Sequence, residues 1–322
     1  MKKSLLCIIA FVLSVTLYSQ ENKSPLSKAT EKVTDKFPPA RMIDVEYQQT
    51  FPSDFESKLF KKEYKEGEIK RRDNIQITVN IPVIKKQRWA IKTSVLYRYN
   101  YFDHGNIVYK GDPDLDIFGN NSDLHYIAGI TSFSYTSKLF GKPAIYNVSL
   151  GVDGSHKDVE AFKAASAGIL VLKADRRTTI TAGLAVNYDP ASLSPIIPIF
   201  TLEHKIRPDF ILDVAIPQRI MVKKGIGKNS RLSLGSELKS NIFYIYPEKE
   251  AYSKSYYHRE IQLKSGFTYE YRMNSFIIYG KTGLVNTIDS KVYKTGETGN
   301  KYIYSSKNDP GFYFSAGVSF NP

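Results

Sequence analysis

Hydrophobic and polar residues alternate with a period of two along most of the chain. In the stretch DNIQITVNIPV, the residues of one parity are Ile75, Ile77, Val79, Ile81 and Val83, and polar residues occupy most of the other parity. A helix would mix these two sets, whereas an extended strand places them on opposite faces. The alternation recurs in WAIKTSVLYRYNYF, AIYNVSLGVD, TITAGLAVNY and EIQLKSGFTYEYR. The pattern therefore predicts an all-β, antiparallel protein.

The alternation, together with intervening turn residues, predicts fourteen strands. They are expected near residues 41–50, 73–84, 89–102, 123–140, 143–154, 165–173, 177–188, 196–206, 209–216, 219–225, 229–246, 258–271, 275–290 and 311–320. Pro217 splits the short pair at 209–225, so a count of twelve stays open. Either even count fits a closed barrel with both termini on the same side of a membrane.

The connections between these segments alternate in length. FGKP, KADRR, IRPD, GKNS and RMNS read as tight turns, and the longer polar segments are 52–72, 104–122, 155–164, 247–258 and 291–309. Short periplasmic turns and long extracellular loops are the layout of a transmembrane barrel. A soluble secreted β-sandwich also alternates. The barrel is favoured because the apolar faces run to about ten residues, the length with which a tilted strand crosses a bilayer.

Aromatic residues and inward charges support the same prediction. Aromatics gather near strand ends at 97–102, 243–246 and 269–271, as in an interface girdle. The candidate lumen-facing charges are Lys92, Arg98, Lys138, Glu237, Lys264, Glu270 and Arg272. Their cationic excess would favour anions in an open pore. The alternative is that these charges pair across strands and plug a narrow barrel.

The N-terminus has the features of a secretory signal peptide. MKKSLLCIIAFVLSVTLYSQ combines Lys2 and Lys3 with an apolar run that is too short to span a bilayer as a helix. We expect residues 1–19 to be removed, 20–40 to form a flexible periplasmic segment, and 41–322 to form the barrel. Cys7, the only cysteine, lies in the leader, which excludes disulfides and thiolate chemistry from the mature chain. For an exported chain of net charge +13, anionic lipid or lipopolysaccharide is a more natural partner than nucleic acid.

The chain ends on PGFYFSAGVSFNP, another alternating segment. Its apolar parity is Phe312, Phe314, Ala316, Val318 and Phe320. This ending resembles the assembly signal of Gram-negative outer-membrane β-barrel proteins, which the barrel-insertion machinery recognises, although Asn321 and Pro322 follow the aromatic on which that family usually stops. By pattern, the mature chain resembles outer-membrane β-barrel proteins of Bacteroidota type. The resemblance implies location in the outer membrane after cleavage of the signal peptide.

The expected function is that of a porin-like passive channel or transporter for a small solute. The alternatives are a non-transporting structural or surface-binding barrel and a secreted sandwich. A membrane-embedded enzyme is least expected, because none of the five histidines is followed two residues later by serine and no Gly-x-Ser-x-Gly motif is present. In GDPDLDIFGNNSD, Asp112, Asp114 and Asp116 are weak candidates for calcium ligands. A polar surface loop without metal or cofactor is the favoured interpretation.

Overall fold

The computed structural model divides the chain into two units, Met1–Thr34 and Asp35–Pro322. It describes residues 37–38, 40–118, 123–189, 192, 194–247, 249 and 252–322. The predicted signal peptide and most of the predicted flexible segment lie outside the described residues. Among the residues that are described, no helix is long and apolar enough to cross a membrane.

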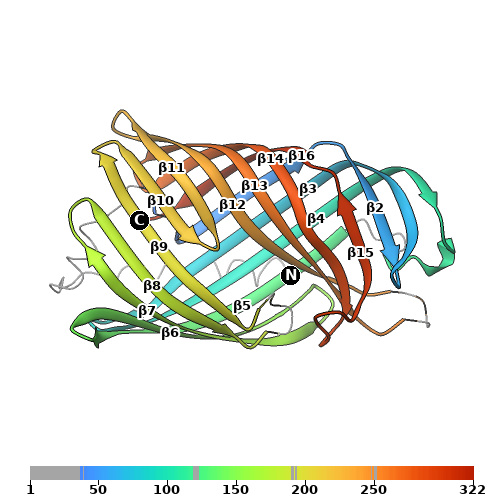
Figure 1. Ribbon diagram of the computed structural model, residues 1–322, viewed down its shortest axis with the longest axis horizontal. Coiled ribbons are helices and arrows are strands. Elements are labelled where there is room, and N and C mark those ends of the chain that lie inside the picture. The colour runs from blue at the N-terminus through green and yellow to red at the C-terminus, as the bar shows by residue number, and fades with distance from the viewer. Residues whose placement is uncertain are drawn as a thin grey trace, which may run out of the picture. The chain divides into compact units, whose positions relative to one another are not determined.

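The described unit consists of one antiparallel sheet and one short 3-10 helix, η2 (Pro113–Leu115). The strands are β1 (Ile43–Thr50), β2 (Ser53–Leu59), β3 (Lys62–Lys85), β4 (Trp89–Tyr109), β5 (Asp123–Leu139), β6 (Lys142–Gly154), β7 (Val159–Ala174), β8 (Thr178–Asn187), β9 (Ile196–Arg207), β10 (Phe210–Ile216), β11 (Arg219–Ile226), β12 (Ser230–Ile245), β13 (Tyr256–Met273), β14 (Phe276–Lys294), β15 (Tyr302–Asn308) and β16 (Gly311–Phe320). Most strands pair with the strands before and after them in the sequence, as Figure 1 shows.

The sheet closes where the first and last strands meet. β1 pairs with β3 on one side and β16 on the other, and β2 pairs with β3 and β15. β1 and β2 are therefore one wall strand interrupted at Pro52, and β15 and β16 are another interrupted at Pro310, where proline has no N–H to donate. Pairing continues beside both interruptions, since the N–H of Phe51 donates to the carbonyl of Phe312 (2.9 Å) and that of Asp309 to Asp54 (2.9 Å).

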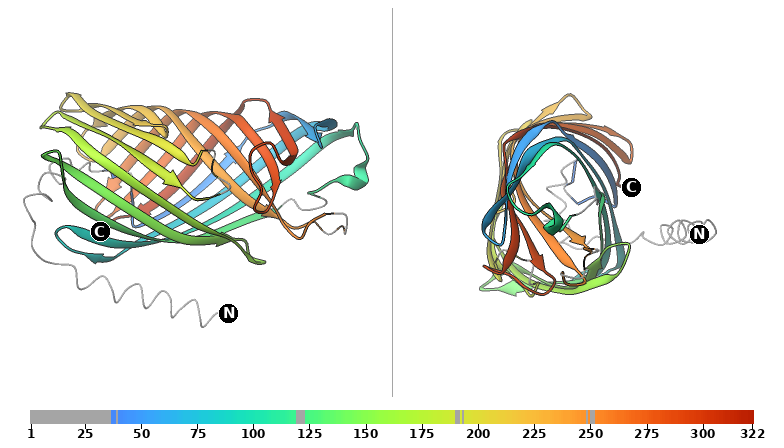
Figure 2. Two further views of the ribbon diagram at one scale, coloured as in Figure 1. Left: turned by 60° about the horizontal axis from the view of Figure 1, so that its bottom comes forward. Right: turned by 90° about the vertical axis from the view of Figure 1, so that its right-hand side faces the viewer.

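The result is a closed antiparallel barrel of fourteen wall strands, seen end-on in the right panel of Figure 2. This confirms the predicted all-β fold and the higher of the two strand counts. β10 and β11 form a full hairpin with Pro217 in its turn, and both strands join the wall through β9 and β12. The closed barrel excludes the secreted sandwich.

Two of the predicted long loops are strands. The prediction was wrong at 52–72, which contains β2 and the first part of β3, and at 291–309, which contains β15. These segments look like loops because their outward residues are charged, as in the ion pair of Lys110 with Glu66 (2.6 Å). In β2, buried and exposed residues nevertheless alternate. Phe55, Ser57 and Leu59 are buried and point inward, and the residues between them are exposed. The charged exterior indicates that this part of the wall faces water.

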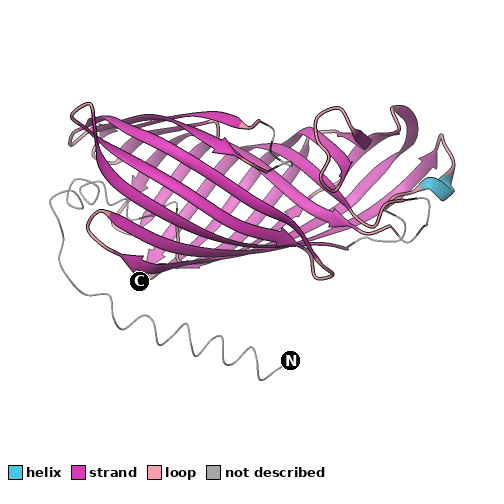
Figure 3. Ribbon diagram, turned by 90° about the horizontal axis from the view of Figure 1, so that it is seen from below, coloured by secondary structure: helices cyan, strands magenta, loops and turns pink. Residues whose placement is uncertain are grey.

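The wall is consequently taller on one side than on the other. β3 and β4 have 24 and 21 residues, and β13 and β14 have 18 and 19, whereas β10 and β11 have 7 and 8. We call one end of the barrel the turn end, where the short connections and the C-terminus lie (Figure 1). The opposite loop end carries η2 and the longer connections (Figure 3).

Near the loop end, β5 and β12 contact each other although they are not neighbours in the sheet. The rings of Tyr126 and Tyr244 stack there at 6.4 Å, and the Tyr244 hydroxyl donates to Asp153 Oδ1 (2.9 Å). Phe243 and Tyr244 are almost fully buried in this contact. The prediction that residues 243–246 belong to an outward aromatic girdle was therefore wrong for these two residues, because β12 packs across the lumen at this height.

The segment before β13 is tied to the turn between β6 and β7. Lys254 donates to Asp158 (2.7 Å), and the Ser255 hydroxyl donates to Glu160 (2.7 Å). The hydrogen bond from Lys254 holds the pKa of Asp158 below its ordinary value. These contacts link the segment before β13 to the turn before β7 and to the start of β7.

The distribution of side chains is inverted relative to a soluble protein. Buried residues include many charged groups, and outward apolar residues around the whole wall are exposed. This outer apolar belt comprises Val45, Val95, Phe133, Val148, Leu150, Leu184, Phe200, Ile220, Leu234, Phe267, Ile278, Phe314 and Val318. Soluble monomers rarely expose contiguous apolar patches larger than a few hundred Å². An apolar belt around a polar lumen is the surface expected of a barrel in lipid.

Leu184 provides a test of this belt, because it is 57% exposed on the outer face of β8. Leu184→Arg is expected to lower the free energy of unfolding in lipid vesicles by about 2–4 kcal/mol, the cost of an arginine facing lipid near the bilayer centre. Leu184→Ala, which adds no charge, should cost less. Urea unfolding in vesicles measures both, and equal stability of the two variants would indicate that the belt contacts water.

Candidate functional site

The lumen is the candidate functional site, and it contains two cavities separated by a constriction. Their order follows from the residues of single strands. On β13, Thr268 and Glu270 line the lower cavity, Gln262 and Lys264 line the constriction, and residues 258 and 260 line the upper cavity. β3 shows the same order, from Asn80 near the turn end to Lys65 near the loop end.

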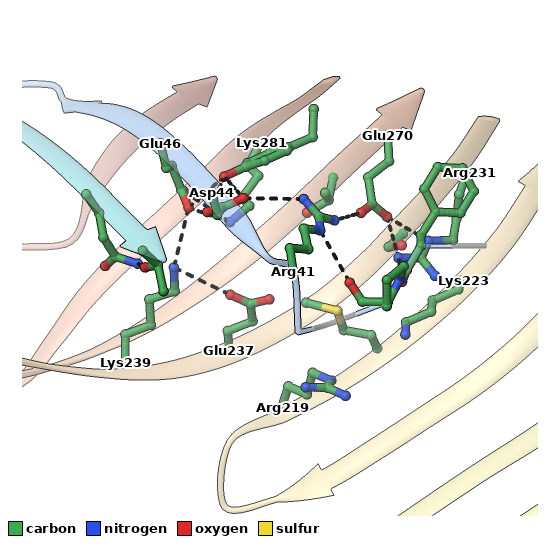
Figure 4. A pocket seen from close by; sticks show the side chains of 18 of the residues that line it. Arg41, Asp44, Glu46, Arg219, Lys223, Arg231, Glu237, Lys239, Glu270 and Lys281 are labelled. Carbon is green, nitrogen blue, oxygen red and sulfur yellow. Dashed lines mark hydrogen bonds and ion pairs between the residues drawn. The ribbon is translucent and has the colours of Figure 1, made fainter. Parts of the chain in front are cut away.

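The lower cavity, near the turn end, has a volume of about 300 Å³ and a charged wall (Figure 4). Glu46 of β1 lies between Lys281 (3.0 Å) and the hydroxyl of Ser315 (2.6 Å). Asp44 accepts from the hydroxyls of Tyr279 (3.0 Å) and Ser319 (2.5 Å). These contacts tie β1 to β14 and β16 on the inner face, across the strands that close the barrel.

The segment before β1 lies inside the lumen at this level. The guanidinium of Arg41 pairs with Glu270 and donates to Ser319 Oγ (2.7 Å). Phe37 is buried, and Arg231 of β12 lies over its ring at 4.7 Å and donates to its carbonyl (3.1 Å). Residues 37 and 38, which belong to the segment 20–40 predicted to be flexible, thus line the lower cavity.

Among the described residues, the constriction is formed by side chains of the wall strands. Its centre is the ion pair of Arg72 with Glu260, which is bidentate at 2.7 and 2.6 Å and almost fully buried. Arg72 also donates to Asn100 Oδ1 (3.2 Å). The adjoining void, which Lys264 and Gln48 line, measures only about 10 Å³. A void of that size holds about one water molecule, so side chains fill most of the space beside the Arg72–Glu260 pair.

The upper cavity, which we call the upper chamber, measures about 330 Å³ and is rich in aromatic rings. Phe55 of β2 contacts His104 edge-on (5.5 Å), and Phe102 stacks on His104 (5.7 Å). Phe118 contacts Tyr304 of the neighbouring strand β15 edge-on (5.2 Å). Strands β2, β3, β4, β13, β14 and β15 and the segment after η2 all contribute to its wall.

Charged and polar side chains make up half of the residues that line the upper chamber, and several of them have partners. Lys65 pairs with Asp116 (2.7 Å), and Glu260 belongs to the constriction. His258 of β13 shares a hydrogen bond with Ser290 of β14, with 2.9 Å between Nε2 and Oγ. The other ring nitrogen of His258, Nδ1, is buried and has no partner among the described residues.

The Ser290–His258 pair has the spacing of a nucleophile and its base. A functioning pair also has a third group that orients the base, and here the Nδ1 position has none within the described part of the chain. Within the described residues, the pair therefore lacks the third member of a catalytic triad. Sequence reasoning missed it because the two residues lie on neighbouring strands rather than two positions apart on one strand.

The acidic loop residues have partners in the loop itself and on β3. Asp112 caps η2 and accepts from the N–H of Asp114 (2.9 Å), and Asp116 pairs with Lys65. Among the described residues, no three histidine or acidic side chains converge on a position that a metal could occupy. Asn120 and Asn121 of the same motif lie outside the described residues.

The structure distributes the seven predicted lumen charges along the barrel. Arg98, Lys264 and Glu270 are buried inside it, and Glu237 lines the lower cavity. Lys92 and Lys138 are exposed, and Arg272 donates to the carbonyl of Asn274 in a turn (3.0 Å). These last three share the inward parity but lie next to the turn end, where water reaches them.

The predicted assembly residues lie on the outer face of β16. Phe312, Phe314 and Val318 are exposed there, and the ring of Phe320 lies 5.1 Å from that of Phe276 on β14. Their recognition by an insertion machinery stays a prediction.

Several residues central to the lumen were missed by the sequence reasoning. They are Arg41, Asp44, Glu46, Arg72, Glu260 and Lys281. The sequence pattern did indicate that some of them point inward. Glu260 has the same parity as Gln262 and Lys264. Asp44 and Glu46 alternate with Val45 and Tyr47. Arg72 was missed because it stands at the end of the segment assigned to a loop.

The model of the family described as "Domain of unknown function (DUF6268)" matches residues 133–321. The chain belongs to this family. The DUF6268 match covers the wall from β5 to β16, including Glu260, Glu270 and Lys281. The partners Arg41, Glu46 and Arg72 come from the strands and segment before it, so the DUF6268 region alone does not complete the lumen.

Solved structures similar to this DUF6268 protein share little sequence with it. An outer membrane channel from Pseudomonas putida F1 has 9% identity and a TM-score of 0.37, covering 93% of this chain and 100% of that one. A Pseudomonas aeruginosa FadL homologue has 9% identity and a TM-score of 0.35, covering 91% and 94%. The outer membrane protease OmpT from Escherichia coli has 8% identity and a TM-score of 0.29, covering 90% and 99%. No curated protein matches the sequence.

The buried ion pair at the constriction generates a stability prediction. Glu260→Gln leaves the Arg72 guanidinium buried without a counter-charge, and it should lower the free energy of unfolding by about 3–5 kcal/mol. The control is Glu66→Gln, which breaks the half-exposed pair with Lys110 and should cost less than about 1 kcal/mol. Urea unfolding in vesicles compares them. Equal losses would mean that the Arg72–Glu260 pair is solvated rather than a dry constriction.

Proposed function

We propose that this chain is an outer-membrane β-barrel of Bacteroidota type that conducts a small solute through a lumen gated by side chains. One observation supports this proposal most directly. Two cavities follow each other along the barrel axis, and among the described residues the side chains of the constriction at Arg72 and Glu260 separate them. Side chains can change rotamer without breaking the backbone pairs of the wall, so such a constriction opens at lower cost than a folded plug. The outer apolar belt supports insertion in lipid.

The charges of the lower cavity favour an anionic solute. Its lining includes the cations Arg41, Arg219, Lys223, Arg231, Lys239 and Lys281, against the anions Asp44, Glu46, Glu237 and Glu270. Most of these groups are paired with one another, which lowers the field that a passing ion meets. A modest preference for anions follows from the remaining excess of positive charge.

A second function, that of a non-transporting barrel, is favoured by one observation. The charges at the constriction are mutually satisfied and densely packed, as in a barrel whose interior serves stability. In that case the constriction would stay closed. Conductance separates the two functions.

The proposal also includes the partners of an outer-membrane barrel, which are lipopolysaccharide around the wall and the insertion machinery at β16. Phe320→Asp should reduce the amount of protein in the outer-membrane fraction severalfold, because the charge lies on the outer face of the closing strand. Phe320→Leu, which keeps that face apolar, is the matched control. Fractionation and immunoblotting measure both, and a soluble, folded Phe320→Asp protein in the periplasm would overturn membrane insertion.

Removing the constriction should open the channel. In planar lipid bilayers, we expect the double variant Arg72→Ala/Glu260→Ala to conduct severalfold more than the unmodified protein, because both bulky side chains are lost together and neither charge is left unpaired. Under a KCl gradient, the reversal potential should indicate preference for chloride.

The matched control is Lys110→Ala/Glu66→Ala, which removes an ion pair from the outer surface and should leave conductance unchanged. Heat-modifiable gel mobility verifies that each variant is folded. A folded constriction variant that conducts no better than this control would favour the non-transporting barrel.

A further inference from the structure

We infer that the barrel wall has a break between β9 and β12 near the loop end, and that an acyl chain of the surrounding lipid occupies this break. The inference concerns lipid binding and goes beyond the proposed channel, since a lipid chain can lie in the wall whether or not a solute crosses the constriction. It rests on strand registers, on the backbone groups at one strand edge and on an apolar run in β9.

The break lies beyond the tip of the hairpin that β10 and β11 form. β10 pairs with β9 as far as Phe200, and β11 pairs with β12 as far as Glu237. Both outer strands continue toward the loop end. Among the described residues, 196–199 of β9 have strand partners on β8 alone, and 239–245 of β12 have them on β13 alone. Figure 1 shows β9 and β12 diverging beyond the hairpin.

β12 turns into the barrel above the hairpin. Leu234 and Tyr244 have the same parity on this strand, and its pairing with β13 has no register shift between them. Leu234 is 50% exposed in the outer apolar belt, whereas Tyr244 is buried and stacks on Tyr126. Tyr126 points inward on β5, because it is buried and Ile127 beside it is exposed. One face of β12 therefore begins on the outer surface and ends inside the barrel, which leaves β9 without a neighbour at this level in the described part of the chain.

The free edge of β9 is arranged to need no partner strand. The N–H of Asn187 donates to the carbonyl of Pro195 (2.8 Å), so every second residue from 195 onward directs its backbone groups toward β8. Ile196 and Pro198 therefore direct theirs toward the break. The Ser194 hydroxyl donates to the carbonyl of Ile196 (2.7 Å) and accepts from its N–H (3.4 Å), and Pro198 has no N–H. Unpaired backbone groups are expensive in hydrocarbon, and residues 196–199 leave no N–H unpaired at the break.

The sequence of β9 also changes at the break. Residues 196–200 read IIPIF and are apolar on both faces, whereas Thr201 and Glu203 continue the inward parity with polar groups. A continuous apolar run is typical of a strand whose two faces both contact apolar groups. Ile197 and Ile199 point inward, yet both are only half-buried. At this level β9 therefore presents apolar side chains to the inside of the barrel as well as to the lipid.

The surface behind the break is uncharged. In register with Ile197 and Ile199, the inward residues of the next two strands are Ala185 and Gly183 of β8 and Ala167 and Ile169 of β7. On the other side of the break, Glu237 and Lys239 line the lower cavity, so Leu238 between them faces away from that cavity. These surfaces match an acyl chain and offer no partner to a charged solute.

The break opens within the surface that faces lipid. Phe200 and Ile220, on the two sides of the hairpin, belong to the outer apolar belt, and Ile196 continues it beyond the hairpin with 56% of its surface exposed. An added peptide strand is a poor occupant, because Pro198 cannot donate to it and Ser194 already bonds to Ile196. Continuity with the belt therefore favours a chain from the bilayer.

Tryptophan fluorescence tests the site on the full chain folded in lipid vesicles. Trp89→Phe removes the only tryptophan, and Ile199→Trp then places one behind the break. In vesicles of phosphatidylcholine with brominated acyl chains, we expect Ile199→Trp to be quenched about as strongly as Leu184→Trp, which faces lipid. The matched control is Ile130→Trp, an inward position on β5 with paired strands on both sides, which should be quenched severalfold less.

Ala185→Phe fills the surface behind the break and should reduce the quenching of Ile199→Trp severalfold without changing that of Leu184→Trp. Heat-modifiable gel mobility verifies that each protein is folded, and Ile197→Trp replaces Ile199→Trp if that variant does not fold. The inference is overturned if brominated lipid quenches the tryptophan behind the break no more than Ile130→Trp, if aqueous acrylamide quenches it in place of brominated lipid, or if Ala185→Phe leaves its quenching unchanged.

Discussion

Closure of the sheet is the constraint on which the rest of the structure depends. The outer wall is apolar, so an open edge would leave a column of backbone N–H and C=O groups without partners in an apolar environment. The edge is removed by pairing β1 with β16 and β2 with β15. Pro52 and Pro310 lie close together along this closing pair, and the missing donors fall where the outer surface changes from apolar to charged. The backbone hydrogen bonds that Pro52 and Pro310 cannot donate are thus missing at a level where water can replace them.

Once the wall is closed, its alternation forces half of the side chains into a narrow lumen. Many of these are charged, and burial of an unpaired charge is expensive. The lumen therefore contains networks rather than isolated groups: Glu46 with Lys281, Glu270 with Arg41, and Glu260 with Arg72. The same networks tie strands that are not neighbours in the sheet, because β1, β16 and β14 lie between β3, which carries Arg72, and β13, which carries Glu260. Stability and obstruction of the lumen consequently have a common source, and any solute pathway must displace groups that also stabilise the fold.

The alternation predicted the wall well, because an outward apolar residue at every second position is a local property of the chain. It failed at β2 and β15, where the outward residues face water and are polar or charged, although Phe55, Ser57 and Leu59 retained the inward half of the pattern. Parity also assigned Lys92 and Lys138 to the lumen without giving their depth, and both lie in water near the turns. The ion pairs across the lumen could not be predicted from one sequence. Which inward charges meet depends on register and on how the wall curves, and neither is written in the spacing of residues along a single strand.

The uneven height of the wall connects these features. If all strands were as short as β10 and β11, the lumen would open to water directly above the constriction. The taller β3, β4, β13 and β14 continue beyond that level, and β2 and β15 pair with them to enclose the upper chamber. Above the short strands, β5 and β12 pack against each other through Tyr126 and Tyr244 and close the remaining side. The uneven height of the wall therefore places a second cavity, lined in part by aromatic rings, between the constriction and the loop end, apart from the charged cavity near the turn end.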